Sequence, residues 1–315
     1  MEKYLSQDHI KAEITPSQEF SEIEFEALLI SVEEQKSPVV FEIEKGGSVA
    51  SSPETDGKRI YFGAMDGIVY CLDAETGQEL WRFEIGYPVS CNLTLLEDRL
   101  LIGAYDENVY CLSLNGKLLW KQNAEGKVAA VGPVWNNRFY FGSESGNLYC
   151  LDVKTGRELW RFRTQGPIAF IPLLYKNRLF FGSFDYCFYC LDPETGELLW
   201  KIKTGQEVIF NAVAQDERIY FASFDCYLYC CGLNGRILWR TRIPKQPNTI
   251  LVLAEGKLIT GSRDYNVYCL DADTGRILWV YHTGALLGGG ISYKDGLLMI
   301  GGDDNLLHVL DLMAG

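Results

Sequence analysis

The most reactive side chains in this 315-residue sequence belong to ten cysteines, and their spacing offers little chemistry. Cys230 and Cys231 are adjacent, but neighbouring side chains of a strand point to opposite faces, which argues against a redox or cofactor role. Cys187 and Cys190 have a CxxC spacing whose odd offset also separates them across a strand. Structural zinc needs four converging ligands, and the sequence offers no second pair. We therefore predict no metal ligands here.

The histidines are equally unpromising as catalytic groups. There are only three, His9, His282 and His308. They form no Ser/His/Asp pattern, and acid–base chemistry without histidine would need a pair of carboxylates that the sequence does not reveal. We expect no catalytic and no cofactor-binding residue.

Six aspartates are the most regular set of charged residues. Together with Ser145 they recur every 39 or 40 residues: Asp66, Asp106, Asp185, Asp225, Asp264 and Asp304. Each could cap its own turn by accepting a backbone N–H, which is the interpretation we favour. The alternative is an acidic ring that binds a cation or an amine.

The residue before each aspartate varies, whereas its surroundings are constant. It is Met65, Tyr105, Glu144, Phe184, Phe224, Arg263 or Asp303. A constant scaffold with one varied position is typical of a recognition surface, and aromatic residues are enriched in interface hot spots. The predicted interaction surface comprises Tyr105, Phe170, Phe184, Tyr186, Phe210, Phe224 and Tyr227. Packing inside the protein is the alternative, because aromatic residues dominate cores as well.

These residues are carried by an internal repeat. Tryptophans lie at intervals of 39 or 40 residues, at Trp81, Trp120, Trp160, Trp200, Trp239 and Trp279. Each ends a run such as GSFDYCFYCLDPETGELLW (182–200). In the first repeat we expect strands at about 48–54, 59–64, 68–73 and 79–85, because RIYFG, VYCL and ELWRF are rich in β-branched and aromatic residues. Four strands in about 40 residues predict a propeller blade.

The tryptophans are expected to pack one blade against the next rather than to stack a ligand, since they recur in six repeats. A seventh run, 301–311, lacks the outer strand and its tryptophan. Shifting the first repeat back by 40 residues places Phe41 in the tryptophan's position. We therefore predict an all-β, seven-bladed propeller over 39–315, whose last blade is closed by a strand at about 39–46.

Residues 1–38 form a separate acidic extension with nine acidic residues and three lysines. Its segment 17–35 fits a helix or an extended strand, so we expect it to be partly helical or extended. It could pack on the propeller or dock on a partner.

The recurring run resembles the PQQ-like repeat, or quinoprotein alcohol dehydrogenase-like, family, whose hallmark is Y-x-L-D-x-x-T-G-x-x-x-W. Asp73, Thr76, Gly77 and Trp81 provide the first example. The resemblance implies a propeller fold. It also implies that quinone-using members hold PQQ and Ca²⁺ beside a disulfide of adjacent cysteines, whereas other members are scaffolds or sensors.

Composition limits the partners. The net charge is −13, so a nucleic-acid partner is not expected. The sequence has no membrane-length apolar stretch and no apolar signal core, which favours a cytoplasmic protein with reduced thiols. We expect a non-catalytic scaffold that binds another protein through its loops. The alternatives are a PQQ- or metal-dependent oxidoreductase, and a small-molecule sensor at the mouth of the central channel.

Overall fold

The computed structural model describes residues 47–49, 51–287 and 290–313. Within these ranges the regular structure is entirely β, and the strands form seven antiparallel sheets. The predicted all-β architecture with seven propeller blades is confirmed. The predicted extension 1–38 and the predicted closing strand 39–46, including Phe41, lie outside the described residues.

The sheets follow one another along the chain and are numbered here one to seven. Sheet one contains β1 (Glu54–Thr55), β2 (Arg59–Gly63), β3 (Ile68–Asp73) and β4 (Glu79–Glu84), and sheet two contains β5 (Thr94–Leu95), β6 (Arg99–Gly103), β7 (Asn108–Ser113) and β8 (Leu118–Asn123). Sheet three contains β9 (Ala130–Trp135), β10 (Arg138–Gly142), β11 (Asn147–Asp152) and β12 (Glu158–Arg163), and sheet four contains β13 (Leu173–Tyr175), β14 (Arg178–Ser183), β15 (Cys187–Leu191) and β16 (Leu198–Lys203). Sheet five contains β17 (Val208–Gln215), β18 (Arg218–Ser223), β19 (Tyr227–Gly232) and β20 (Ile237–Arg242), and sheet six contains β21 (Val252–Ala254), β22 (Lys257–Gly261), β23 (Asn266–Asp271) and β24 (Ile277–His282). Sheet seven contains β25 (Ile291–Lys294), β26 (Leu297–Gly301) and β27 (Leu307–Asp311).

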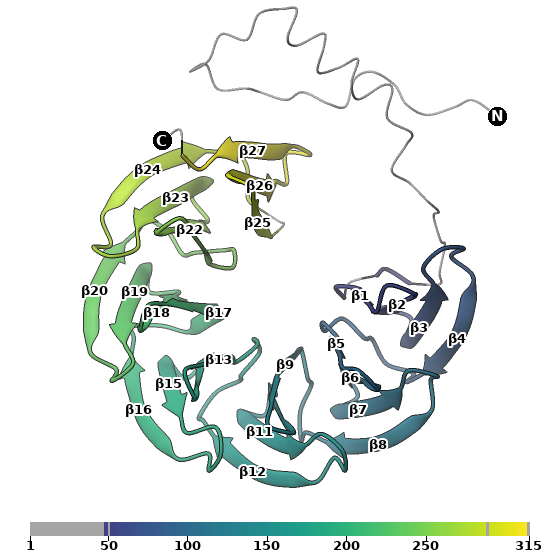
Figure 1. Cartoon of the computed structure of the whole chain (residues 1–315). Coiled ribbons are helices and arrows are strands. Elements are labelled where there is room, and N and C mark those ends of the chain that lie inside the picture. The colour runs from purple at the N-terminus through teal and green to yellow at the C-terminus, as the bar shows by residue number, and fades with distance from the viewer. Residues whose placement is uncertain (1–46, 50, 288–289, 314–315) are drawn as a thin grey trace, which may run out of the picture.

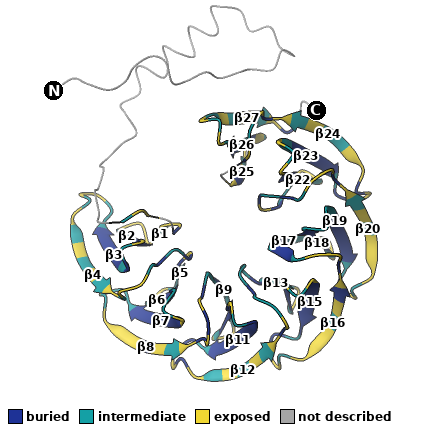
Figure 2. Cartoon of the chain, turned by 180° about the vertical axis from the view of Figure 1, so that it is seen from behind, coloured by how far each residue is buried: buried dark blue, intermediate teal, exposed yellow. Residues whose placement is uncertain are grey.

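The sheets are arranged round an arc, with the first strand of each toward the centre and the fourth at the periphery (Figure 1). Seen from behind in Figure 2, the third strands of sheets one to six are dark and buried, whereas β27 and the outer strands β8, β12, β16 and β20 are largely exposed. No helix in the described part of the chain is long and apolar enough to cross a membrane.

The turn between the third and fourth strands depends on local hydrogen bonds. In sheet one, Asp73 Oδ1 accepts hydrogen bonds from the backbone N–H and the hydroxyl of Thr76, both at 2.8 Å. Gly77 follows with a φ of 70°, a conformation that suits glycine. The D-x-x-T-G pattern therefore encodes this turn locally.

The first strand of sheet one is shorter than predicted. β1 covers two residues, Glu54–Thr55, rather than 48–54. Upstream, Ser51 Oγ accepts a hydrogen bond from Gly63 N–H and donates one to Gly63 O, both at 2.9 Å. A side chain thus replaces the backbone ladder at this point.

Candidate interaction surface

The turns between second and third strands lie on the same side of the propeller as the connections between sheets; we call this side the loop face. Each varied loop residue donates its backbone N–H to a carbonyl 17 residues earlier, in the connection that enters its own sheet. The N···O distances are 2.8–3.2 Å for the pairs 65–48, 105–88, 144–127, 184–167, 224–207, 263–246 and 303–286. The backbone at this position is thus held alike in all seven sheets while the side chain differs.

The six aspartates accept hydrogen bonds from their own turns and third strands, and Asp185 and Asp225 also accept a backbone N–H from the connection before the sheet. In sheet five, Asp225 Oδ1 accepts the backbone N–H of Tyr227 at 3.1 Å, and Asp225 Oδ2 accepts the hydroxyl of Tyr229 at 2.7 Å. The same pair of bonds recurs for Asp66, Asp106, Asp185 and Asp264, with hydroxyl distances of 2.5–2.7 Å. At Asp304 the second partner is His308 Nε2, at 3.0 Å.

This geometry matches the turn-capping interpretation and explains the tyrosine pKa values. Burial, followed by the neighbouring Asp66 carboxylate, raises the pKa of Tyr70 to about 12. Burial and Asp264 raise the pKa of Tyr268 to about 12 in the same way. In the described residues no three His, Cys, Asp or Glu side chains are grouped so that they could hold a metal ion. The aspartates therefore do not converge on a shared cation site.

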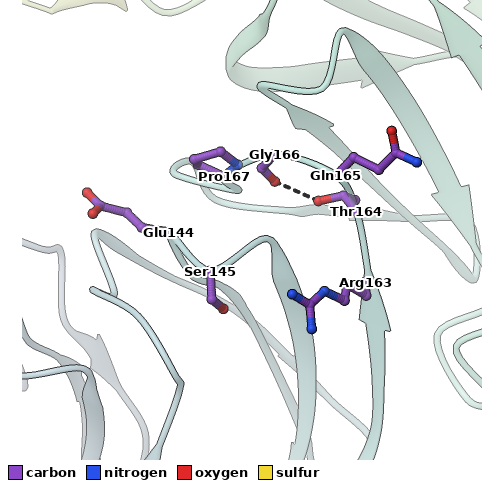
Figure 3. A pocket seen from close by; sticks show the side chains of 7 residues that line it. All are labelled: Glu144, Ser145, Arg163, Thr164, Gln165, Gly166 and Pro167. Carbon is purple, nitrogen blue, oxygen red and sulfur yellow. Dashed lines mark hydrogen bonds between the residues drawn. The ribbon is translucent and has the colours of Figure 1, made fainter.

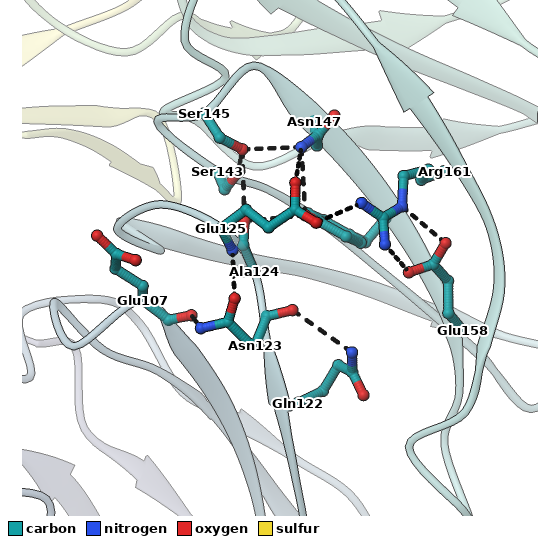
Figure 4. Close-up of polar contacts among 11 residues, drawn as sticks. Glu107, Gln122, Asn123, Ala124, Glu125, Ser143, Ser145, Asn147, Glu158 and Arg161 are labelled. Atoms are coloured by element: carbon teal, nitrogen blue, oxygen red, sulfur yellow. Dashed lines mark hydrogen bonds and ion pairs between the residues drawn. The ribbon is translucent and has the colours of Figure 1, made fainter.

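Sheet three has Ser145 in place of the aspartate and builds its network differently (Figure 4). Glu125, from the connection before the sheet, accepts a hydrogen bond from Asn147 at 3.3 Å and pairs with Arg161 at 2.7 Å. Arg161 holds the pKa of Glu125 below its usual range. Tyr149 donates its hydroxyl to Ala124 O at 2.9 Å instead of to a carboxylate. The sequence pattern did not indicate that Glu125 supplies the carboxylate of this network.

The structure brings some of the predicted surface aromatics together but not all. Phe184 and Tyr186 lie on one turn of sheet four and are 37% and 39% exposed. Phe170 and Phe210 are half-buried and contact one another, with ring centroids 5.3 Å apart. Tyr105 belongs to sheet two and is separate from this group.

The other two aromatics are half-buried beneath cations. The Phe224 ring centroid lies 5.0 Å from the guanidinium carbon of Arg263. The Tyr227 ring is 5.1 Å from the guanidinium carbon of Arg240. Sheets four and five therefore present aromatic rings together with cations, which favours acidic or aromatic ligands.

Charge is concentrated in the same sector. Residues 126–246, which include sheets three to five, contain 15 Lys and Arg against 11 Asp and Glu, a net +4 in a chain of −13. The exposed positions of their outer strands hold Arg161 and Arg163 in β12, Lys201 and Lys203 in β16, and Arg240 and Arg242 in β20. Lys203 Nζ lies 4.9 Å from the Tyr186 ring. This cationic sector was not predicted, although the alternating cations after Trp160, Trp200 and Trp239 were its sequence signal.

A shallow pocket of about 590 Å³ opens on the loop face beside this sector (Figure 3). Its lining is Glu144, Ser145, Arg163, Thr164, Gln165, Gly166 and Pro167. Thr164 Oγ1 donates to Gly166 O at 2.7 Å, which holds the connection in a compact bend. The pocket offers one acidic and one basic side chain and no histidine or cysteine.

Five repeat tryptophans join consecutive sheets. Trp81 Nε1 donates to Leu114 O of the next sheet at 3.0 Å, and Gly116 lies so close that an added Cβ would be 2.7 Å from the indole. Equivalent bonds of 2.7–3.2 Å join Trp120, Trp160, Trp200 and Trp239 to carbonyls 33 residues later. Trp279 Nε1 is buried and has no hydrogen-bond partner in the described structure.

The adjacent cysteines do not form a cofactor site. Cys230 and Cys231 are free thiols that are buried in different core clusters, on opposite faces of β19. Burial raises the pKa of both to about 12. Cys187 and Cys190 are likewise divided between two clusters. Together with the self-contained aspartates, this arrangement does not fit a PQQ and Ca²⁺ site.

Two family models match the chain. A model described as "Beta-alanine-activating enzyme, beta-propeller" matches residues 23–247, and one described as "Outer membrane protein assembly factor BamB" matches residues 188–315. Among curated proteins, Outer membrane protein assembly factor BamB of Burkholderia pseudomallei (strain K96243) is 30% identical over 114 residues. That segment is 36% of this chain and 30% of the relative's own length.

Solved structures show the same fold. BamB from Moraxella catarrhalis has a TM-score of 0.73 at 18% identity, covering 85% of this chain and 87% of that one. The computationally designed Ika8 protein has a TM-score of 0.72 at 21% identity, covering 84% of this chain and 83% of that one.

One expectation is overturned by these comparisons. The curated relative is named for outer membrane protein assembly, which is at odds with a cytoplasmic location. The cytoplasmic prediction is therefore wrong. It rested on the first residues of the sequence, and the free thiols that the structure shows say nothing about the compartment.

Proposed function

Because the chain belongs to the PQQ-like β-propeller family, with a match to the propeller model of the beta-alanine-activating enzyme over 23–247, we propose that it is a non-catalytic scaffold that binds another protein through the loop face of sheets three to five.

The observation that carries this proposal is the combination of a fixed backbone with varied, exposed side chains. Phe184 N–H is bound to Pro167 O at 3.0 Å, so its ring projects from a rigid position. Tyr186 lies two residues on, with Lys203 against its ring. A preorganised aromatic anchor loses little conformational freedom on binding, which is characteristic of hot-spot residues.

Charge defines the kind of partner. The cationic sector complements an acidic surface or segment, and its Lys and Arg would increase the association rate at low salt. The BamB relative carries the name of an outer membrane protein assembly factor. We therefore propose proteins of outer membrane assembly as the first partners to test. The two matched families have different names and share the propeller, so the partner is read from the surface and not from the fold.

The test is a binding measurement with purified full-length chain and candidate partners. The double variant Phe184→Ala/Tyr186→Ala is expected to weaken binding by about tenfold or more. Tyr87→Ala is the matched control, since Tyr87 is an exposed aromatic (57%) in the connection between sheets one and two, outside sheets three to five. Equal affinity of both variants would refute the assigned surface.

A second binding measurement tests the contribution of charge. Lys203→Glu should weaken binding mainly through a slower association rate, and the difference from wild type should shrink as salt screens the interaction. Lys117→Glu, at the turn between β7 and β8 of sheet two and outside the cationic sector, is its control. A salt-independent loss would indicate that Lys203 acts by packing and not by charge.

A further inference from the structure

A second pocket lies between sheets four and five, on the side of the propeller opposite the loop face. Its volume is about 490 Å³, a size typical of small-molecule sites. It lies at the turns that join first to second strands and third to fourth strands, because successive antiparallel strands reverse direction. Its lining includes Arg178, Arg218 and Arg236, beside Gly232, Leu233 and Leu238.

Arginine recurs at the first position of the second strand in sheets one to five, and in sheets one and two it has a carboxylate of its own sheet nearby. The hydroxyl of Tyr61, followed by the charge of Asp56, raises the pKa of Arg59. Arg99 pairs with Asp98 at 2.7 Å. Both cations are thus balanced within their own sheet.

In sheets three and five the carboxylate comes from the following sheet instead. The pKa of Asp192 in sheet four is lowered by the hydrogen bonds of its own turn and further by the charge of Arg138 in sheet three. The pKa of Asp271 in sheet six is lowered in the same way by its turn and by Arg218 in sheet five. Arg218 also forms an ion pair with Asp273 of that turn. The turn aspartate of one sheet therefore faces the arginine of the sheet before it.

Arg178 in sheet four has neither kind of partner. The residues that precede it are Lys176 and Asn177, so its own turn supplies no acid. Its guanidinium donates to Leu233 O of sheet five at 2.7 Å. No carboxylate in the part of the chain that the structure describes forms an ion pair with Arg178.

The missing partner is explained by one position in the turn of sheet five. Gly232 lies opposite Arg218 in this sheet, as Asp271 lies opposite Lys257 in sheet six. Gly232 therefore occupies the position of the turn aspartate, and it brings no carboxylate to Arg178.

The other charged residues at the pocket do not replace this carboxylate. Glu217 pairs with Lys176 at 3.3 Å, and Asp216 accepts a hydrogen bond from Gln215 at 3.2 Å. Arg236 is exposed and forms no ion pair with another described residue. Three arginines and two acidic residues give the lining a net charge of +1, which favours an anion of low charge.

We propose that this pocket binds a small organic carboxylate. Its acid group takes the position relative to Arg178 that the turn aspartates hold relative to Arg138 and Arg218, and a guanidinium binds a carboxylate through two parallel N–H donors. A second acid group reaches Arg236. The hydrocarbon part of the ligand lies against Leu238, which is 48% exposed. The site is separate from the proposed protein-binding surface, which lies on the loop face.

Titration calorimetry of the full chain with succinate, a small dicarboxylate, tests the assigned chemistry. We expect saturable binding of one succinate per chain with a Kd of about 1 mM or below, and no binding of the neutral analogue succinamide. Failure of succinate to saturate would overturn the proposal, as would tighter binding of inorganic phosphate. A capped Asp-Leu-Asp tripeptide presents the same acid groups from a protein segment. If it binds about tenfold more tightly than succinate, an acidic protein segment replaces the small molecule as the ligand; weaker binding supports the small molecule.

Arginine variants locate the site. Arg178→Gln should weaken succinate binding by about tenfold or more. Arg59→Gln is the matched control, because Arg59 donates to Leu114 O at 2.9 Å as Arg178 does to Leu233 O, and it should leave succinate binding unchanged. Should Arg178→Gln not fold, the exposed Arg236 carries the test: unchanged succinate affinity in Arg236→Gln would overturn the assigned pocket.

Gly232→Asp supplies the missing carboxylate from the chain itself. An added Cβ at Gly232 would lie 3.2 Å from Asn234 Oδ1, the end of a side chain that can move. We expect this variant to bind succinate about tenfold more weakly or worse, with a Tm no lower than that of wild type, because the new acid pairs with Arg178. A Gly232→Asp protein that binds succinate as wild type does would show that the ligand is not held at Arg178.

Discussion

The hydroxyl of Tyr229 in β19 donates a 2.7 Å hydrogen bond to the carboxylate of Asp225, four residues before it in the loop-face turn. This pair is repeated round the propeller, and it joins the loop-face turn to the third strand beneath it. The turn is thereby fixed in the position from which the varied residue projects. Stability of the turn and presentation of the surface are thus coupled.

Removing the hydroxyl should reveal this coupling. Tyr229→Phe removes the hydroxyl donor of the half-buried Asp225 carboxylate and leaves it only the backbone N–H groups of Tyr227 and Gly205, so we expect the free energy of unfolding to fall by about 1–2 kcal/mol. Chemical denaturation measures the change. Tyr175→Phe, in which the altered residue lies on an inner strand, is the comparison variant and should lose less. A Tyr229→Phe protein as stable as wild type would contradict a structural role for the pair.

The tryptophan bonds predict a difference between two identical substitutions. Trp160→Phe removes an N–H that donates to Pro193 O at 3.2 Å, and we expect a loss of about 1–3 kcal/mol from the lost bond and the lost packing. Trp279→Phe should cost less, since Trp279 Nε1 has no acceptor in the described structure. Urea unfolding of both variants measures the two losses in the free energy of unfolding. Equal losses would show that the tryptophans contribute through packing and not through the hydrogen bond.

Thiol reactivity should separate one cysteine from the rest. Nine of the ten are buried, and Cys226 alone is half-buried. Burial raises the pKa of Cys91 to about 12 and that of Cys190 to about 12. A thiol reagent at neutral pH should therefore label one equivalent per native chain, and Cys226→Ser should abolish that fast phase. Rapid labelling of several cysteines in the native protein would contradict the packing.

The buried thiols also predict that the free energy of unfolding decreases at alkaline pH. An unfolded cysteine ionises near pH 9, whereas the buried group keeps its proton to about pH 12. Unfolding then releases protons in that window, so stability is fully present below pH 9 and is lost progressively between pH 9 and 12. Unfolding midpoints measured across this range should fall steadily. An unfolding midpoint that increases as the pH is raised above 9 would contradict the raised pKa of the buried thiols.

Calcium provides a test of the aspartate geometry. Because each carboxylate already accepts hydrogen bonds from its own turn and from a tyrosine, or from His308 in the case of Asp304, millimolar Ca²⁺ should leave Tm unchanged relative to Mg²⁺. A saturable rise in Tm that disappears in Asp264→Asn would restore the acidic-ring interpretation.

Features with a local cause could be read from the sequence. The D-x-x-T-G turns at Asp73 and Asp192 depend on side chains two or three residues away, so the pattern alone indicates them. The strand alternation and the 40-residue period then imply blades, because a sheet with one apolar pattern repeated seven times must stack on copies of itself. The separation of Cys230 from Cys231 also has a local cause, because successive side chains of a strand point to opposite faces of the sheet.

Other features depend on which sheets become neighbours, and only the tertiary structure decided them. Phe184 and Phe224 occupy the same repeat position, yet one is exposed and the other lies under Arg263 of the next sheet. Glu125 replaces a missing aspartate from a different segment of the chain. Leu307 carries the same strand pattern as Val69, and its exposure reflects the absence of a described successor sheet. Sequence determines the face on which a side chain lies through local geometry, but burial is a property of two surfaces, and the second surface comes from a distant part of the chain.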